Sequence, residues 1–354
     1  MNDIDINDKR NQSEFKNHTF SKYSKTHVKN ELIKAFYNQN IEPACYWSVE
    51  LICAGHYSDL WSCIIQYTSK YIHIGNPKLF IYLSKRLEYF KQILYNGYTN
   101  SELELRNNKA IRQLFAEIIT IVTLSKKKHP FESYAIKDFS DFDITNMTNR
   151  LKAPSTDFGK AIFQPDDPKE IFIAINEYMF QISQSSKDLT SACYWIEWIC
   201  KFESLQKIKK NNCEAERRNF VPVQDKFQKN IIWLLWEGLL NEASKRSETH
   251  VNIIKSLLDL FCIKFTLSSI KQRRFILYTA SSFLTEVFDY NNKLVNNTDI
   301  IKNISNNIDI IYKEVKKNEI KPDTDYLFTN VASNTEKSLN KLETLNLMLN
   351  KSGS

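Results

Sequence analysis

Two clusters of basic residues are the candidates for a binding site in this sequence. Residues 201–229 contain eight Lys or Arg and four acids. Residues 271–274 (KQRR) form the second cluster, next to Phe275 and Tyr278. Basic residues interleaved with aromatic ones suit phosphate contacts combined with base stacking, although a solvated loop and a helix start produce the same charge pattern. The residues predicted to bind nucleic acid or a partner are Lys207, Lys209, Lys210, Arg217, Arg218, Arg273 and Arg274.

Three glutamates inside apolar stretches offer a different chemistry. Glu50, Glu197 and Glu237 would need partners if they are buried, because an unpaired charge in the interior is very costly. Catalysis would require two such acids in one cleft with pKa values pushed apart. The alternative is that each acid makes a structural ion pair. An enzyme that uses buried glutamates is therefore kept as an alternative, and no catalytic residue is predicted.

The sequence offers no nucleotide-hydrolysis or metal motif. With only 6 glycines, it cannot supply the spacing of a phosphate-binding loop or a dinucleotide fingerprint. Cys53 and His56, with Cys63 nearby, fit no common zinc module and lie in apolar helical runs. Such cysteines are more typical of a core. We predict no metal and no cofactor.

A near-repeat indicates how the chain is organised. Residues 44–47 (ACYW) return as residues 192–195, each time inside a bulky apolar stretch. A Tyr-Trp pair buries a large area, so each copy should lie in a core. We expect the rings to be interior, and any chemistry to lie elsewhere on the molecule.

Composition favours an all-α, multi-helix fold in two helical halves around these aromatic-rich buried helices. Hydrophobic residues make up 42% of 354 residues, and 6 glycines and 8 prolines are too few for a β-sandwich or barrel. Long uninterrupted periodic segments predict roughly ten to twelve helices. The expected parts are a disordered arm (1–27), an N-terminal helical domain (28–128), a linker (129–167), a C-terminal helical domain (168–320) and a tail with a short amphipathic helix (321–354).

Charge and cysteine content suggest the setting. The net charge of +7 permits phosphate contact without requiring it. An odd number of cysteines, 7, mostly within apolar runs, suits a reducing intracellular compartment. No signal-peptide pattern opens the chain and no apolar run could span a bilayer, so we predict no membrane partner.

Two stretches carry a family resemblance. Residues 43–55 (PACYWSVELICAG) through 73–79 (HIGNPKL), and the block from 194–198 (YWIEW) through 231–236 (IIWLLW), resemble uncharacterised proteins of large nucleocytoplasmic DNA viruses. The resemblance covers about half of the chain. It implies a viral protein with no assigned activity, located in the host cytoplasm or nucleus at the viral factory, or in the virion.

A more distant resemblance is confined to residues 43–79. They are similar to the helical C-terminal region of clamp-loader-related AAA+ ATPases of replication restart, which shows an Ala-x-Tyr-Trp helix followed by an Ile-Gly…Asn-Pro turn. Residues 74–77 (IGNP) make a shorter turn, and the ATPase core is absent. This resemblance therefore implies a shared helical scaffold and no ATP-driven function.

Together these observations favour a non-enzymatic helical binding or scaffold protein of a virus, associated with DNA replication or transcription machinery. Its partners would be nucleic acid, or a replication, transcription or virion protein. A virion structural protein, such as a minor capsid or internal protein, is the second alternative.

Overall fold

The computed structural model describes residues 4–99, 101–136, 140–142 and 144–320. These residues form helices joined by turns, with two isolated β-bridges and no strand, so the predicted all-α, multi-helix fold is confirmed. The predicted tail, 321–354, lies outside the described residues. None of the helices in the described ranges combines the length and apolar composition needed to cross a membrane.

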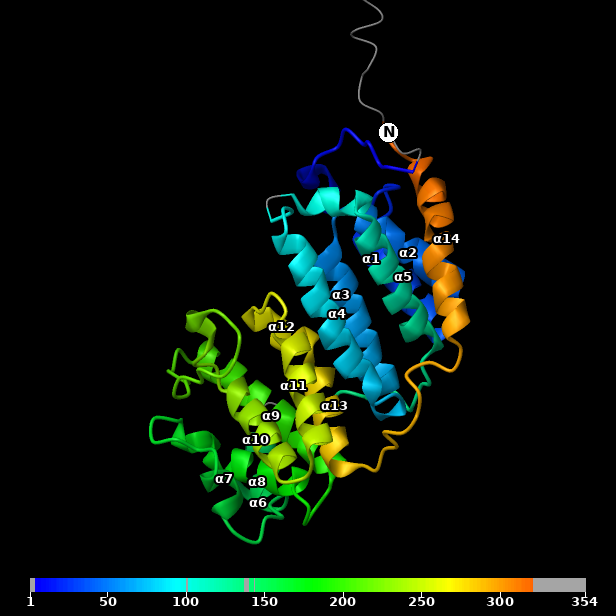
Figure 1. Cartoon of the computed structure of the whole chain (residues 1–354). Coiled ribbons are helices and arrows are strands. Elements are labelled where there is room, and N and C mark those ends of the chain that lie inside the picture. The colour runs from blue at the N-terminus through cyan, green and yellow to red at the C-terminus, as the bar shows by residue number, and fades with distance from the viewer. Residues whose placement is uncertain (1–3, 100, 137–139, 143, 321–354) are drawn as a thin grey trace, which may run out of the picture.

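The first five α-helices form one group (Figure 1). Asn108 shows how local sequence starts such a helix, because its side-chain oxygen accepts hydrogen bonds from the free amides of Ala110 and Ile111. The helices are α1 (Lys25–Tyr37), α2 (Ile41–Cys53), α3 (Tyr57–Tyr67), α4 (Lys78–Tyr95) and α5 (Lys109–Leu124). Short elements beside them are η1 (Gln12–Phe15), the π-helical η2 (Thr68–Ile72), η3 (His73–Gly75) and η4 (Glu102–Asn107).

A second group contains the remaining long helices except the last. Asp188 caps α9 by accepting the Ser191 amide at 3.0 Å. The α-helices are α6 (Ile144–Thr148), α7 (Asp157–Lys160), α8 (Phe172–Ile182), α9 (Leu189–Ile208), α10 (Ile232–Ser244), α11 (Glu248–Phe261), α12 (Leu267–Gln272) and α13 (Arg274–Thr285). The short 3-10 elements are η5 (Ser140–Phe142), η6 (Lys169–Ile171) and η7 (Asp225–Phe227).

The last described helix, α14 (Thr298–Lys316), returns to the first group. It packs against α5 and α2, at the far side of the first group from α11–α13 (Figure 1). Ile308, Tyr312 and Val315 are its buried residues. The prediction that 168–320 forms one C-terminal domain is therefore wrong for α14.

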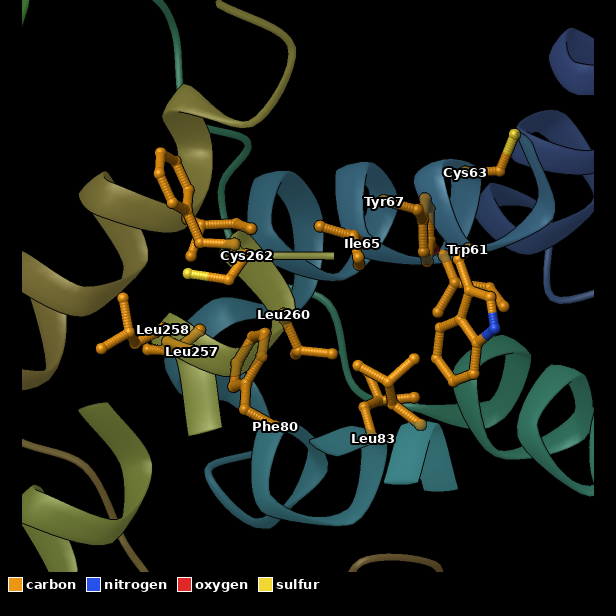
Figure 2. Close-up of a cluster of buried hydrophobic side chains, with 14 of the residues drawn as sticks. Trp61, Cys63, Ile65, Tyr67, Phe80, Leu83, Leu257, Leu258, Leu260 and Cys262 are labelled. Atoms are coloured by element: carbon orange, nitrogen blue, oxygen red, sulfur yellow. The ribbon is translucent and has the colours of Figure 1, made fainter. Parts of the chain in front are cut away.

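The two groups pack directly on each other. Helix α11 lies against α4, and α13 contacts η2 and η3. Figure 2 shows side chains of both groups in one apolar cluster, with Trp61 and Leu83 from the first and Leu257 and Leu260 from the second. The core is thus continuous across the seam between the groups.

The N-terminal arm is ordered from residue 4 onward. Ile6, Phe15 and Phe20 are at most 2% exposed, and the Lys9 amide donates to the Ile320 carbonyl at 3.0 Å. The arm thus packs onto the first group beside the end of α14. The prediction of a disordered arm is wrong for residues 4–27, because three of its apolar side chains are buried. Their spacing follows no helical period, so the sequence pattern did not indicate this burial.

Residues 129–167 are also more than a linker. Helix α7 packs against α8, and Ile162 is 3% exposed. Gly159 is buried with its amide hydrogen-bonded to the Asn176 side chain at 2.9 Å. A segment with several prolines and little periodicity therefore still contributes to the core of the second group.

The two ACYW copies differ in burial. Tyr194 and Trp195 are 6% and 1% exposed, as predicted. Tyr46 and Trp47 are only half-buried. Trp47 meets the exposed Tyr23 ring edge-on at 5.5 Å. The expectation of interior rings is therefore wrong for the first copy, because α2 turns these two residues toward the arm rather than toward the centre.

Candidate functional site

Two of the residues predicted to be functional, Lys207 and Arg274, line a hollowed surface along the C-terminal half of α9. Two adjoining hollows of about 360 and 220 Å³ lie there, and both are lined by Glu203, Lys207 and Leu267. We call the two together the basic groove. Its charged lining residues are Lys201, Lys207, Lys226, Lys229, Lys271 and Arg274, with Glu197, Glu203 and Glu214.

Three segments build the basic groove. The polar second half of α9 forms one wall, α12 and the start of α13 form another, and the loop 209–230 closes the second hollow. Leu267 and Ile270 of α12 contribute apolar surface between the charges. The sequence folds this way because residues 192–199 of α9 are all buried, whereas the helix becomes polar and more exposed after Ile199.

A buried ion cluster fixes the loop 209–230. Arg218 is 2% exposed and donates to both carboxylate oxygens of Asp167, at 2.8 and 2.7 Å. Its Nε donates to Glu237 on α10 at 2.7 Å, and these two acids raise the pKa of Arg218 against the lowering effect of burial. Arg218 therefore cannot contact phosphate. Its prediction as a binding residue is wrong, because a charge cluster in the sequence does not show which member turns inward.

Arg273 is likewise structural. It is 8% exposed, and its Nη1 donates to the Phe261 carbonyl at 2.7 Å, at the C-terminal end of α11. A cation at this position complements the unpaired carbonyls of a helix end. The prediction that Arg273 binds a partner is therefore wrong. Its neighbour Arg274 points to the basic groove instead.

Glu197 positions Arg274 in the groove wall. The carboxylate accepts hydrogen bonds from Arg274 Nη1 at 3.0 Å and from Tyr278 Oη at 2.8 Å. Burial raises the pKa of Glu197, and the positive charge of Arg274 and the Tyr278 hydroxyl oppose this rise. Tyr278 is 1% exposed, so it supports the acid and offers no stacking surface to a base.

Glu203 positions Lys207 on α9 in the same way and also binds the loop 209–230. It is 8% exposed and accepts hydrogen bonds from Lys207 Nζ at 2.5 Å and Asn230 Nδ2 at 2.6 Å. This joins α9 to the loop that carries Lys226 and Lys229. Two of the three groove acids thus act as buried acceptors, and the third, the exposed Glu214, lies 3.9 Å from Lys229 Nζ. The lining holds six basic residues against three acids.

The remaining predicted residues surround the groove without lining it. Lys209 and Lys210 are exposed in the turn after α9, where Lys210 adopts a φ of 57°. Arg217 is exposed and pairs with Asp225 at 3.0 Å. The structure thus brings Lys207 and Arg274 together in the groove and leaves the other three exposed predicted residues outside its lining.

Four basic groove residues were not singled out by the sequence. They belong to the same two clusters of the sequence. Helical spacing would have identified only part of the set, because Lys226 lies in the short 3-10 element η7 and Lys229 in the turn after it. Lys271 Nζ has no partner among the described residues. The four are Lys201, Lys226, Lys229 and Lys271.

The three glutamates of the apolar stretches have separate partners, and Glu237 is only half-buried. Glu50 accepts hydrogen bonds from the Thr19 hydroxyl at 2.9 Å and from the Ser21 amide at 3.0 Å in the N-terminal arm. Glu197 and Glu237 have the separate partners given above, and no hydrogen bond among the described residues joins two of the three. Their positions lend no support to an enzyme built on these acids.

The described residues contain no group of three His, Cys, Asp or Glu side chains placed to hold a metal ion. The described cysteines are all unpaired, and burial raises the pKa of Cys45 and Cys63 to about 12. Thiols with such pKa values are poor nucleophiles at neutral pH. Comparison of the chain with family models, with curated proteins and with solved structures found no match.

Proposed function

We propose that this chain is a non-enzymatic binding protein whose basic groove takes the phosphate backbone of a nucleic acid. The supporting observation is the groove lining, in which six basic side chains face three acids and two of those acids are buried acceptors for groove residues. Phosphate contacts made by Lys and Arg supply most of the affinity of non-specific nucleic-acid binding.

The groove favours contact with the backbone over reading of bases. Its apolar lining is aliphatic in the first hollow, where Ile136, Leu267 and Ile270 lie. Phe227 is the aromatic residue of the second hollow, and Lys226 Nζ lies 4.9 Å from the centre of its ring. Since contacts to the phosphate backbone carry no sequence information, we infer sequence-tolerant binding. A role in viral replication or transcription, or in the virion, stays a prediction that rests on the sequence resemblance.

Fluorescence anisotropy with labelled single-stranded and duplex oligonucleotides tests this proposal. Six phosphate contacts predict that affinity falls by about 10³-fold between 50 and 200 mM salt. Absence of binding at 50 mM salt up to about 100 µM protein, a concentration that detects weak non-specific complexes, would contradict the proposal.

A further inference from the structure

A separate pocket, which shares no lining residue with the basic groove, lies at the seam between the two helix groups. It measures about 330 Å³ and is lined by α3 and α4 on one side and by the end of α11 on the other. We call it the seam pocket. Interfaces between helix groups are common places for small-molecule sites, and this volume is within their usual range.

Aromatic and aliphatic side chains form most of the seam pocket. Tyr57, Trp61 and Phe90 are at most 6% exposed, whereas Tyr95 is 68% exposed. Trp61 belongs to the apolar cluster of α3, α4 and α11 shown in Figure 2. The pocket therefore has a wall of buried aromatic rings and one exposed ring, Tyr95, that a ligand could cover.

One carboxylate in this pocket forms no salt bridge among the described residues. Asp259 of α11 is half-buried, and its Oδ2 accepts a hydrogen bond from the Ser84 hydroxyl at 2.8 Å. Ser84 is its single hydrogen-bond partner among the described residues. Burial and the negative charge of Glu88 raise the pKa of Asp259, and the Ser84 hydrogen bond and the positive charge of Lys91 only partly oppose this rise.

The other charges in the seam pocket are already matched. Lys91 pairs with Glu88 at 2.7 Å, and Lys264 pairs with Glu102 of the first group at 2.9 Å. Asp259 is therefore the acid that a bound cation would neutralise. An ammonium group beside aromatic rings gains further attraction from their negative faces.

We propose that the seam pocket binds a small organic cation that has an aromatic or apolar body and a primary ammonium group. The body lies against the aromatic wall, and the ammonium group pairs with Asp259. The pocket is distinct from the basic groove, so this proposal stands independently of nucleic-acid binding.

Isothermal titration calorimetry of the full chain tests this proposal with tryptamine and its neutral analogue tryptophol. We expect tryptamine to bind at least tenfold more tightly than tryptophol. Asp259→Asn should remove that difference, while its amide oxygen can still accept the Ser84 hydrogen bond. The matched control is Asp157→Asn, at an exposed aspartate outside the pocket, which should leave the preference intact.

Ser58→Trp provides a second test that does not change a charge. Ser58 is exposed at the pocket lining, so a tryptophan there should block entry without disturbing the core and should abolish tryptamine binding. Three results would overturn the proposal: equal affinity for the amine and the alcohol, an unchanged preference in Asp259→Asn, or unchanged binding in Ser58→Trp.

Discussion

Arg218 donates two parallel hydrogen bonds to Asp167, at 2.8 and 2.7 Å, where the two side chains are 1% and 0% exposed. The same guanidinium binds Glu237 of α10. The three residues come from separate segments: the chain before α8, the loop after α9, and α10. This cluster therefore fixes the loop that carries Lys226 and Lys229 into the basic groove.

Replacing Arg218 should destabilise the fold strongly. Arg218→Met leaves Asp167 buried and unpaired, and breaking a buried pair in this way costs about 3–5 kcal/mol in the free energy of unfolding. Urea denaturation followed by circular dichroism measures this change. Lys34→Met is the control, because the surface pair of Lys34 with Glu31 contributes less than about 1 kcal/mol. Similar destabilisation by the two variants would contradict the assigned role of Arg218.

Shortening one buried side chain of the N-terminal arm tests whether the arm belongs to the core. Phe20 is 0% exposed, lies 6.2 Å from the Phe15 ring, and has the Arg10 guanidinium over its face. Phe20→Ala should therefore lower the free energy of unfolding by about 3–5 kcal/mol. Tyr95→Ala, at a ring that is 68% exposed, should change it little. A loss below about 0.5 kcal/mol for Phe20→Ala, which is typical of surface sites, would show that the arm does not pack.

The sequence was sufficient to predict the class of fold. Scarce glycine and proline, and apolar spacings of three and four, predicted helices that the structure contains. Local residues mark the ends of α2, with Pro43 in its first turn and Gly55 two residues after its last residue, Cys53. Such local signals work because a helix start or stop depends on a few neighbouring residues.

Which helices pack on each other, and which polar side chains are buried, could not be predicted in the same way. The apolar face of α14 shows that the helix packs somewhere, but not that it returns to α5. Phe15 and Phe20 stand alone in a polar segment and give no periodic signal. Arg218 and Arg273 are chemically identical to the more exposed arginines beside them, Arg217 and Arg274. Their burial depends on acceptors far along the chain, which are Asp167 and the Phe261 carbonyl.

His73 predicts how stability depends on pH. The imidazole is 4% exposed, and burial lowers its pKa, although the hydrogen bond to the His129 carbonyl opposes this. Below the ordinary pKa of 6.5 the unfolded chain then binds the proton more readily than the folded chain. His73 therefore contributes stability that is present above pH 6.5 and lost as the pH falls through its lowered value.

Asn is a suitable replacement, because His73 has a φ of 32° and Asn tolerates positive φ values. Chemical denaturation of wild type and His73→Asn at pH 8, 6 and 5 measures the effect. The other titrating groups are common to both proteins. The advantage of wild type over the variant should shrink as the pH falls. A difference that is constant across this range would contradict the prediction.

The central claim is that the basic groove binds phosphate, and the salt dependence of nucleic-acid affinity in two matched variants tests it most directly. One variant replaces Lys207, Lys226 and Lys271 of the groove by Gln. The other replaces Lys85, Lys255 and Lys302 by Gln as well. These three lysines are exposed on α4, α11 and α14 and line neither hollow of the basic groove. The groove variant should lower the slope of log affinity against log salt by about 2–3, and the control variant should keep the wild-type slope. Equal slopes in the two variants would contradict the claim.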